Sequence, residues 1–417
     1  MNDATDSLSG PSVSGFTALR HRDFALFLIA RNVANGSSTM MQVAIAYQLY
    51  ELTGDPMSLA YLGLALFVPS IAFSLVTGYV ADVFDRRTVL TSVFCVSLIA
   101  AALFYLYTRA GTDSVWPIYA ILLLLGTSRA FASAVSQSYV TNLVPEAFLP
   151  NALAWFQTAS KTASIVGPAL GGVIYDLIGP AGVYGTASGL IAAAIVMTLG
   201  IRTRTPRGDR KPVTIETLLA GLVYIWEKKI ILGSITLDLF IVLMGGVTVL
   251  LPIFAKDILD VGPSGAGLLR SAMAVGGIVA ALSLTHIPMR RNIGLILFAS
   301  VTAYGLSTAL FALSEIFLLS LFAMALIGAS DMVSVYIRLG LLQFATPDDM
   351  RGRVIAVNSV FTGTSNEIGD FRAGLAAAFM GAVGAALMGG VGAVVIAVFF
   401  WHKFPELRRV QRMDGPF

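Results

Sequence analysis

The amino-acid sequence predicts an all-α membrane protein, with twelve transmembrane helices arranged as two parallel six-helix repeats. Composition, the number of long apolar segments and an internal repeat support this fold class. The chain has 417 residues, of which 56% are hydrophobic and only 12% are charged, and its mean hydropathy is +0.80. Because a soluble domain carries roughly 25% charged residues, we expect most of this chain to lie in lipid.

Twelve segments are long and apolar enough to cross a bilayer, which takes about 20 residues per helix. They are residues 24–50, 58–82, 88–108, 116–141, 149–177, 180–201, 230–256, 262–285, 292–312, 315–343, 350–378 and 381–403. Most connections between them are short and contain helix breakers, such as Gly179-Pro180.

The one long polar connection divides the chain. We predict an N-terminal six-helix bundle at 1–201, a linker at 202–229 and a C-terminal six-helix bundle at 230–417. Within the linker, the apolar residues of 214–226 recur near one face, which is typical of an amphipathic helix at a membrane surface.

The basic residues indicate the orientation. With the N-terminus inside, the inner segments hold 19 of the 27 lysines and arginines. Cytoplasmic loops are enriched in these residues, so we expect a multi-pass protein of the plasma (inner) membrane with both termini cytoplasmic. A net charge of +3 without a basic, aromatic-interleaved patch argues against nucleic-acid binding. Cys95 is the single cysteine, which excludes an intrachain disulfide.

The two halves of the chain resemble each other. An offset of 202 aligns the segment Gly126–Arg129 with Gly328–Asp331, and Gly167 with Gly369. A near-constant offset without inversion of topology predicts parallel repeats, as in the major facilitator transporters.

A short charged turn, residues 78–90, joins the second and third segments. Its Gly78, Asp82, Arg86 and Arg87 have a spacing that resembles the loop between helices two and three of the major facilitator superfamily. The whole chain resembles the multidrug and siderophore exporter branch of that superfamily, which includes enterobactin and macrolide exporters. This closer resemblance rests on the segments Leu28–Arg31, Gly78–Asp82 and Leu342–Val354 and on the Gly-Pro motif of Gly167–Gly172.

The resemblance implies a secondary active transporter that works by alternating access. The expected activity is proton-coupled efflux of an amphiphilic small molecule, drug-like or siderophore-like. In such relatives Asp82 latches onto the partner domain near the start of helix eleven, and here that start carries Arg351 and Arg353. The expected conformational gate comprises Gly78, Asp82, Asp85, Arg86, Arg87, Gly167, Pro168, Arg351 and Arg353. The alternative is that Arg86 and Arg87 only enforce topology.

Polar side chains at membrane depth are candidates for the site, because each is costly there. Arg31, Asn35, Ser38 and Gln42 lie on one face of the first helix by their spacing. The predicted substrate cavity comprises Arg31, Asn35, Ser38, Gln42, Arg129, Gln157, Lys161, Asp238, Asp331 and Asn366. The alternative is that these groups join helices across a dry interface.

Arg129 and Asp331 occupy equivalent positions in the two repeats and have opposite charges. We hypothesise that they face each other across the cavity and that proton uptake weakens their attraction; a permanent salt bridge, or two separately satisfied groups, is the alternative. The candidate proton carriers are Asp238, Asp331, Glu367 and Asp370. Arg338, near the end of its helix, is interpreted as a snorkelling side chain, and Arg270 and Arg372 have no assigned role.

The sequence gives little support for metal binding, phosphate binding or catalysis. The three histidines have no metal-ligand spacing, no phosphate-binding Gly-x-x-x-x-Gly-Lys-Ser/Thr loop is present, and no catalytic pairing sits at depth. We therefore expect no cofactor, no metal and no enzyme activity. The expected partners are a small-molecule substrate, protons and the lipid bilayer. The protein is expected to be a monomer. Uptake of a nutrient or metal chelate, and a non-transporting receptor with the same fold, remain alternatives.

Overall fold

The computed structural model describes residues 17–73, 76–77, 80, 83–204, 222–286, 289 and 291–412. Within these ranges the secondary structure is helical, and no strand occurs. Of the predicted interfacial helix at 214–226, residues 222–226 are described and are helical, and the rest lies outside the described residues.

The described residues of the first half form five long α-helices. They are α1 (Arg22–Thr53), α2 (Pro56–Ala72), α4 (Arg86–Ala110), α5 (Trp116–Leu143) and α6 (Leu149–Leu199), with short 3-10 turns η1 (Ala18–Arg20) and η2 (Glu146–Phe148). The 51-residue α6 is broken at Gly179, whose φ of 72° only glycine adopts readily. The chain reverses there into a second arm, as the Gly179-Pro180 pair predicts.

The second half follows the same order. It comprises α8 (Lys229–Met244), η3 (Val247–Leu250), α9 (Leu251–Ile253), a π-helical turn η4 (Phe254–Ile258), α10 (Gly262–His286), α11 (Ile293–Ala312), α12 (Phe317–Phe344), α13 (Asp348–Lys403) and α14 (Pro405–Arg408). The 56-residue α13 is broken at Gly381, with φ 77°, between the two predicted segments 350–378 and 381–403.

The segment predicted at 230–256 lies within a described span of membrane length, Lys229–Ile258, but it is not one regular α-helix. The α-helix ends at Met244, and the chain continues through Gly245 and a left-handed Gly246 (φ 85°) into 3-10 and π-helical turns. A Cβ on Gly246 would lie 2.6 Å from the carbonyl oxygen of Gly369 in α13. The break therefore lets the backbone of this segment approach α13 closely.

Eight described helical segments are long and apolar enough to cross a membrane. Two of them have 54 residues each; one contains α6, and the other lies within α13. At 1.5 Å per residue, 54 residues would extend about 80 Å, far more than the roughly 30 Å hydrocarbon core. The breaks at Gly179 and Gly381 divide each into two arms of membrane length.

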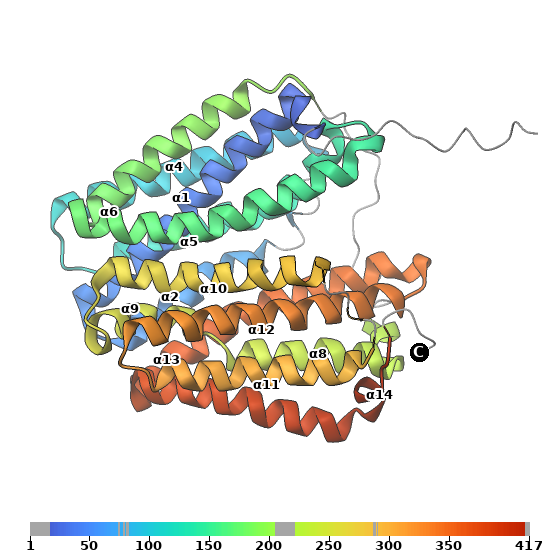
Figure 1. Cartoon of the computed structure of the whole chain (residues 1–417). Coiled ribbons are helices and arrows are strands. Elements are labelled where there is room, and N and C mark those ends of the chain that lie inside the picture. Colours follow the sequence, from blue (N-terminus) through green and yellow to red (C-terminus); the bar gives the residue numbers. More distant parts are fainter. Residues whose placement is uncertain are drawn as a thin grey trace, which may run out of the picture.

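The helices run side by side in two groups (Figure 1). One buried apolar cluster is built mainly from residues 18–201 and a second mainly from residues 237–410. Between the groups α2 packs on α13 and α6 packs on α10. We call the end of the molecule that carries α14 the terminal end, and the other, with the turns at Gly54 and Gly111, the opposite end (Figure 1).

Small residues allow the two groups to touch. A Cβ on Gly374 in α13 would lie 2.6 Å from the backbone nitrogen of Ala60 in α2. A Cβ on Gly172 in α6 would lie 2.4 Å from the carbonyl oxygen of Pro263 in α10. Backbone therefore meets backbone at both contacts, which leaves no room for larger side chains there.

Candidate functional site

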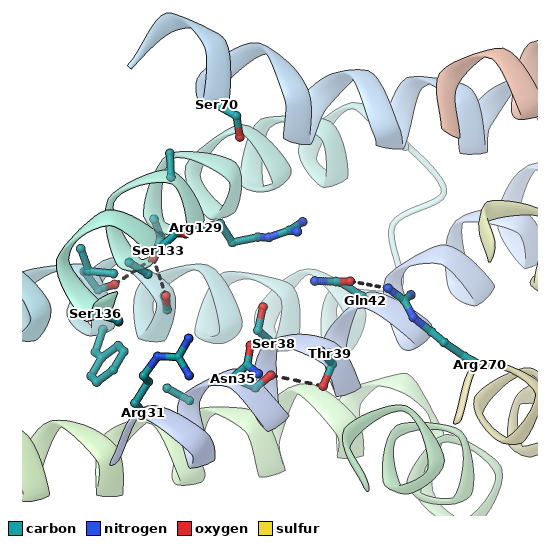
Figure 2. A pocket seen from close by; sticks show the side chains of 17 residues that line it. Arg31, Asn35, Ser38, Thr39, Gln42, Ser70, Arg129, Ser133, Ser136 and Arg270 are labelled. Carbon is teal, nitrogen blue, oxygen red and sulfur yellow. Dashed lines mark hydrogen bonds between the residues drawn. The ribbon is translucent and has the colours of Figure 1, made fainter. Parts of the chain in front are cut away.

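A first cavity of about 530 Å³ opens among α1, α5 and α10 (Figure 2). Four predicted residues of α1 line it together, as their helical spacing requires: Arg31, Asn35, Ser38 and Gln42. Arg129 and several serines of α5 form another wall, and Arg270 of α10 enters from the second half. The sequence left Arg270 unassigned, although a charge at membrane depth was itself a signal.

Two of the three arginines in this cavity are held by protein groups. The Nη1 atom of Arg31 donates to Ser160 Oγ at 2.6 Å, and its guanidinium carbon lies 4.0 Å from the centre of the Phe156 ring. The Nη2 atom of Arg270 donates to Gln42 Oε1 at 2.8 Å. This last bond connects the two halves of the chain near the middle of the molecule.

Arg129 differs from its neighbours. Its side chain extends into the first cavity (Figure 2). Among the described residues it makes no hydrogen bond or ion pair, but Glu367 and Asp370 of α13 lie close enough to interact with its charge.

A second cavity of about 400 Å³ lies within the second half, among α8, α12 and α13. The predicted residues Asp238, Asp331 and Asn366 line it. Asp238 forms an ion pair with Arg338 and accepts a hydrogen bond from Thr362 Oγ1 at 3.1 Å. The Arg338 side chain is only 9% exposed, so its interpretation as a snorkelling residue is wrong.

Arg129 and Asp331 line different cavities, and no ion pair joins them in this conformation. The charge that reaches Asp331 is that of Lys161 on α6. Arg129 and Arg270 instead act on Glu367 and Asp370. The predicted proton carriers thus fall into three environments: Asp238 is paired, Asp331 faces a cavity, and Glu367 and Asp370 lie near two arginines.

Two predicted cavity residues of α6 lie outside both cavities, although the charge of one of them, Lys161, reaches Asp331. Gln157 and Lys161 are exposed and line neither cavity.

The hydrogen bonds and ion pairs that three gate residues of the terminal end make with described residues stay within the first half and the start of the linker. Asp85 caps the N-terminus of α4, accepting from Thr88 N at 3.2 Å, and forms an ion pair with Arg204 at 2.9 Å. Arg86 donates to Asn142, and Arg87 donates to the Leu199 carbonyl oxygen at 2.5 Å. Gly78 and Asp82 lie outside the described residues.

The basic residues at the start of α13 form their hydrogen bonds to described residues within the second half. Arg351 Nε donates to the Gln343 carbonyl oxygen at 3.2 Å, and Arg353 Nη1 approaches Met350 Sδ at 3.8 Å.

The Gly-Pro pair of α6 lies where three helices meet. A Cβ on Gly167 would lie 2.7 Å from the carbonyl oxygen of Gly36 in α1. A Cβ on Gly267 of α10 would lie 2.2 Å from the carbonyl oxygen of Pro168. These contacts place the pair in the interface between the halves.

At the opposite end, hydrogen bonds that the sequence did not predict join the halves. The Tyr50 hydroxyl of α1 donates to the Asp257 carboxylate of η4. Asp176 of α6 accepts from the backbone nitrogen of Ser264 at 3.1 Å, in the first turn of α10, where a helix favours an anion.

Arg372 of α13 caps the broken end of α8. It donates to the carbonyl oxygens of Leu243, Met244 and Gly245 at 2.7–2.8 Å. The last carbonyls of a helix have no intrahelical partner, so this side chain stabilises the break beside the cavities. Among the described residues, no three His, Cys, Asp or Glu side chains gather to hold a metal ion.

Membrane-length helices around buried polar cavities define a multi-pass membrane protein with a transporter fold. The chain belongs to the transmembrane secretion effector family of the major facilitator superfamily, whose sequence pattern matches residues 13–415. Members of this superfamily are membrane transporters and not enzymes.

Curated relatives span almost the whole chain. The enterobactin exporter EntS of Citrobacter koseri is 25% identical over 396 residues, which cover 94% of each protein. The protein of the same name from Escherichia coli O157:H7 is 24% identical over the same length and coverage. These matches agree with the exporter branch that the sequence motifs predict.

Solved structures share the fold. A variant of the nucleoside transporter NupG superposes with a TM-score of 0.76 at 14% identity, covering 92% of this chain and 100% of that one. A bacterial homologue of the iron transporter ferroportin, in an inward-facing state, gives a TM-score of 0.67 at 16% identity, covering 91% and 98%.

Proposed function

We propose that this protein is a secondary active transporter that exports an amphiphilic small molecule in exchange for protons. It crosses the membrane twelve times as two parallel six-helix repeats, and α6 and α13 each supply two crossings. Residues 1–201 and 230–417 form the two repeats, 202–229 is the linker, and both termini face the cytoplasm of a plasma (inner) membrane.

The observation that carries the proposal is the pair of polar cavities inside apolar helices. Arg129 and Asp331 line these cavities away from lipid. A charged side chain at membrane depth is costly and marks a pathway for a solute or an ion. A chain with only a scaffolding role would gain nothing from that cost.

The distribution of contacts supports alternating access. The hydrogen bonds that join described residues of the two halves lie from the middle of the molecule to the opposite end, as in Gln42–Arg270 and Tyr50–Asp257. With the termini in the cytoplasm, this conformation is closed towards the exterior. Transport then requires these contacts to break while the terminal end closes.

The carboxylates differ in how well they suit proton exchange. Asp238 is neutralised by Arg338, which favours a constant charge. Asp331, Glu367 and Asp370 make no ion pair with a described residue within 4 Å. These three are therefore the proposed carriers. The curated relatives are enterobactin exporters, which favours export over uptake.

Flux into and out of proteoliposomes tests the proposal. Enterobactin and a panel of amphiphilic dyes would be followed under a pH gradient imposed in either direction. Export predicts that substrate moves against the proton flow and that Asp331→Asn, Glu367→Gln or Asp370→Asn abolishes the response to pH. Glu315→Gln, in an exposed turn, is the matched control. Co-directional movement of substrate and protons would instead identify uptake, and no flux of any compound would contradict transport.

A further inference from the structure

The charges of the first cavity are unbalanced. Arg31, Arg129 and Arg270 line it, and no Asp or Glu does. Glu367 and Asp370 lie near Arg129 and Arg270 without lining the cavity, and even with both ionised, two carboxylates face three guanidinium groups. The cavity therefore keeps a cationic surplus.

The three arginines are not equally available. Arg31 is held by Ser160 and by the Phe156 ring, and Arg270 by Gln42. Arg129 makes no hydrogen bond to a described residue, and its side chain extends into the open volume of the first cavity (Figure 2). A guanidinium that makes no hydrogen bond in a partly buried site has unsatisfied donors, and a bound anion would supply the missing acceptors.

The other residues that line the first cavity suit a ligand that has an anionic oxygen group and an apolar body. Besides the arginines, hydroxyl groups of Ser38, Ser133 and Ser136 offer further donors, and Val93 and Phe94 add apolar surface. Guanidinium groups bind carboxylates and phosphates through paired, charge-assisted hydrogen bonds. A cation would meet like charge in this cavity.

We infer that the first cavity binds the anionic group of the transported molecule, a carboxylate, sulfonate or phosphate, with Arg129 as its main contact and Arg31 and Arg270 beside it. This inference rests on the proposed transport function and adds to it the charge of the substrate.

The test compares two xanthene dyes of opposite charge, anionic 5-carboxyfluorescein and cationic rhodamine 6G. Their binding to the full-length protein in phosphatidylcholine nanodiscs is measured by fluorescence anisotropy, with empty nanodiscs subtracted. We expect the wild type to bind carboxyfluorescein at least roughly tenfold more tightly than rhodamine 6G, since one charge-assisted hydrogen bond supports a factor of this size.

Three variants identify the residue responsible. Arg129→Gln should lose roughly tenfold or more in affinity for carboxyfluorescein, and Arg129→Lys should recover part of it because the charge returns. Arg109→Gln, an exposed arginine in the last turn of α4, should bind as the wild type does. Because Arg129 makes no hydrogen bond or ion pair with a described residue, Arg129→Gln should keep the thermal stability of the wild type, which separates lost binding from lost folding.

Binding and flux together separate this inference from the proposed function. Preferred binding of carboxyfluorescein that depends on Arg129 supports the anion site even if proteoliposomes show no flux, which would count against transport alone. Preferred binding of rhodamine 6G, equal binding of both dyes, binding of neither, or unchanged affinity in Arg129→Gln overturns the anion site, even if a dye is transported.

Discussion

The carboxylate of Asp238 on α8 and the guanidinium of Arg338 on α12 form an ion pair in the wall of the second cavity, with side chains 11% and 9% exposed. Thr362 of α13 donates to the same carboxylate at 3.1 Å. Three helices of the second half are thereby joined at one charge. Such a pair is expensive to break, because the remaining partner becomes an uncompensated buried charge.

Neutralising one partner of this pair should therefore destabilise the protein. We expect Asp238→Asn to cost about 3–5 kcal/mol, the range for breaking buried pairs. The double variant Asp238→Leu/Arg338→Met should lose much less, because it buries no unpaired charge. Thermal unfolding of all variants in one detergent measures the difference. An Asp238→Asn protein as stable as the wild type would show that the pair is open to water or to another partner.

The link between Tyr50 and Asp257 should help to hold the opposite end closed. Removing a charge-assisted hydrogen bond costs about 1.5–3 kcal/mol, so Tyr50→Phe should shift the closed-to-open ratio by roughly tenfold or more. Spin labels at Asp113→Cys and Glu315→Cys, exposed turns at that end in the two halves, would report this shift after Cys95→Ser removes the native thiol.

Asp260→Asn provides a control for that experiment. Asp260 is an exposed residue just beyond η4, three positions after Asp257, so its neutralisation tests whether loss of a nearby charge alone opens this end. The distance distribution should lengthen in Tyr50→Phe and stay unchanged in Asp260→Asn. Equal distributions in all three proteins would mean that the bond does not limit opening.

Much of the fold could be predicted from local signals. Apolar segment length located the helices, and Gly179-Pro180 marked the break in α6. The predicted boundary between segments 350–378 and 381–403 falls at the break in α13. Periodicity placed Arg31, Asn35 and Gln42 on one face, and all three line the first cavity.

The partners of the charged residues could not be predicted in the same way. Gln42 and Arg270 are 228 positions apart, and Asp238 and Thr362 are 124 apart. Which helices meet, and at what height, depends on packing of the whole bundle. Matching positions in the two repeats suggested Arg129 with Asp331, but the residues line separate cavities. Repeat symmetry fixes equivalent positions but does not determine which of them come into contact.

Arg372 should be a stability determinant. Its guanidinium binds the carbonyl oxygens of Leu243, Met244 and Gly245 at the end of α8, where the last carbonyls of a helix have no intrahelical partner. Hydrogen bonds that involve a charged group contribute about 1.5–3 kcal/mol, so Arg372→Gln should lower the unfolding temperature clearly, and Arg372→Lys should restore little because an ammonium lacks the planar fork. Arg109→Gln is the exposed control. Equal melting temperatures for Arg372→Gln and the control would show that water serves these carbonyls equally well.

Close backbone contact between α6 and α10 should be required to close the opposite end. A Cβ on Gly267 would lie 2.2 Å from the carbonyl oxygen of Pro168, a backbone atom that cannot rotate away. Gly267→Ala should therefore separate the halves at this end, lengthen the spin-label distance and reduce flux. Gly328→Ala places a methyl group 1.8 Å from the carbonyl oxygen of Met273, within the second half, and should lower stability without lengthening that distance.

Gly189→Ala is the neutral member of this glycine series. Gly189 lies in the second arm of α6, and nothing lies within 4 Å of the added methyl group. Alanine favours a helix over glycine by about 1 kcal/mol, so this variant should be at least as stable as the wild type and fully active. If Gly267→Ala matches Gly189→Ala in spin-label distance and in flux, the contact of α10 with Pro168 does not govern closure, and the Gly-Pro pair of α6 serves packing alone.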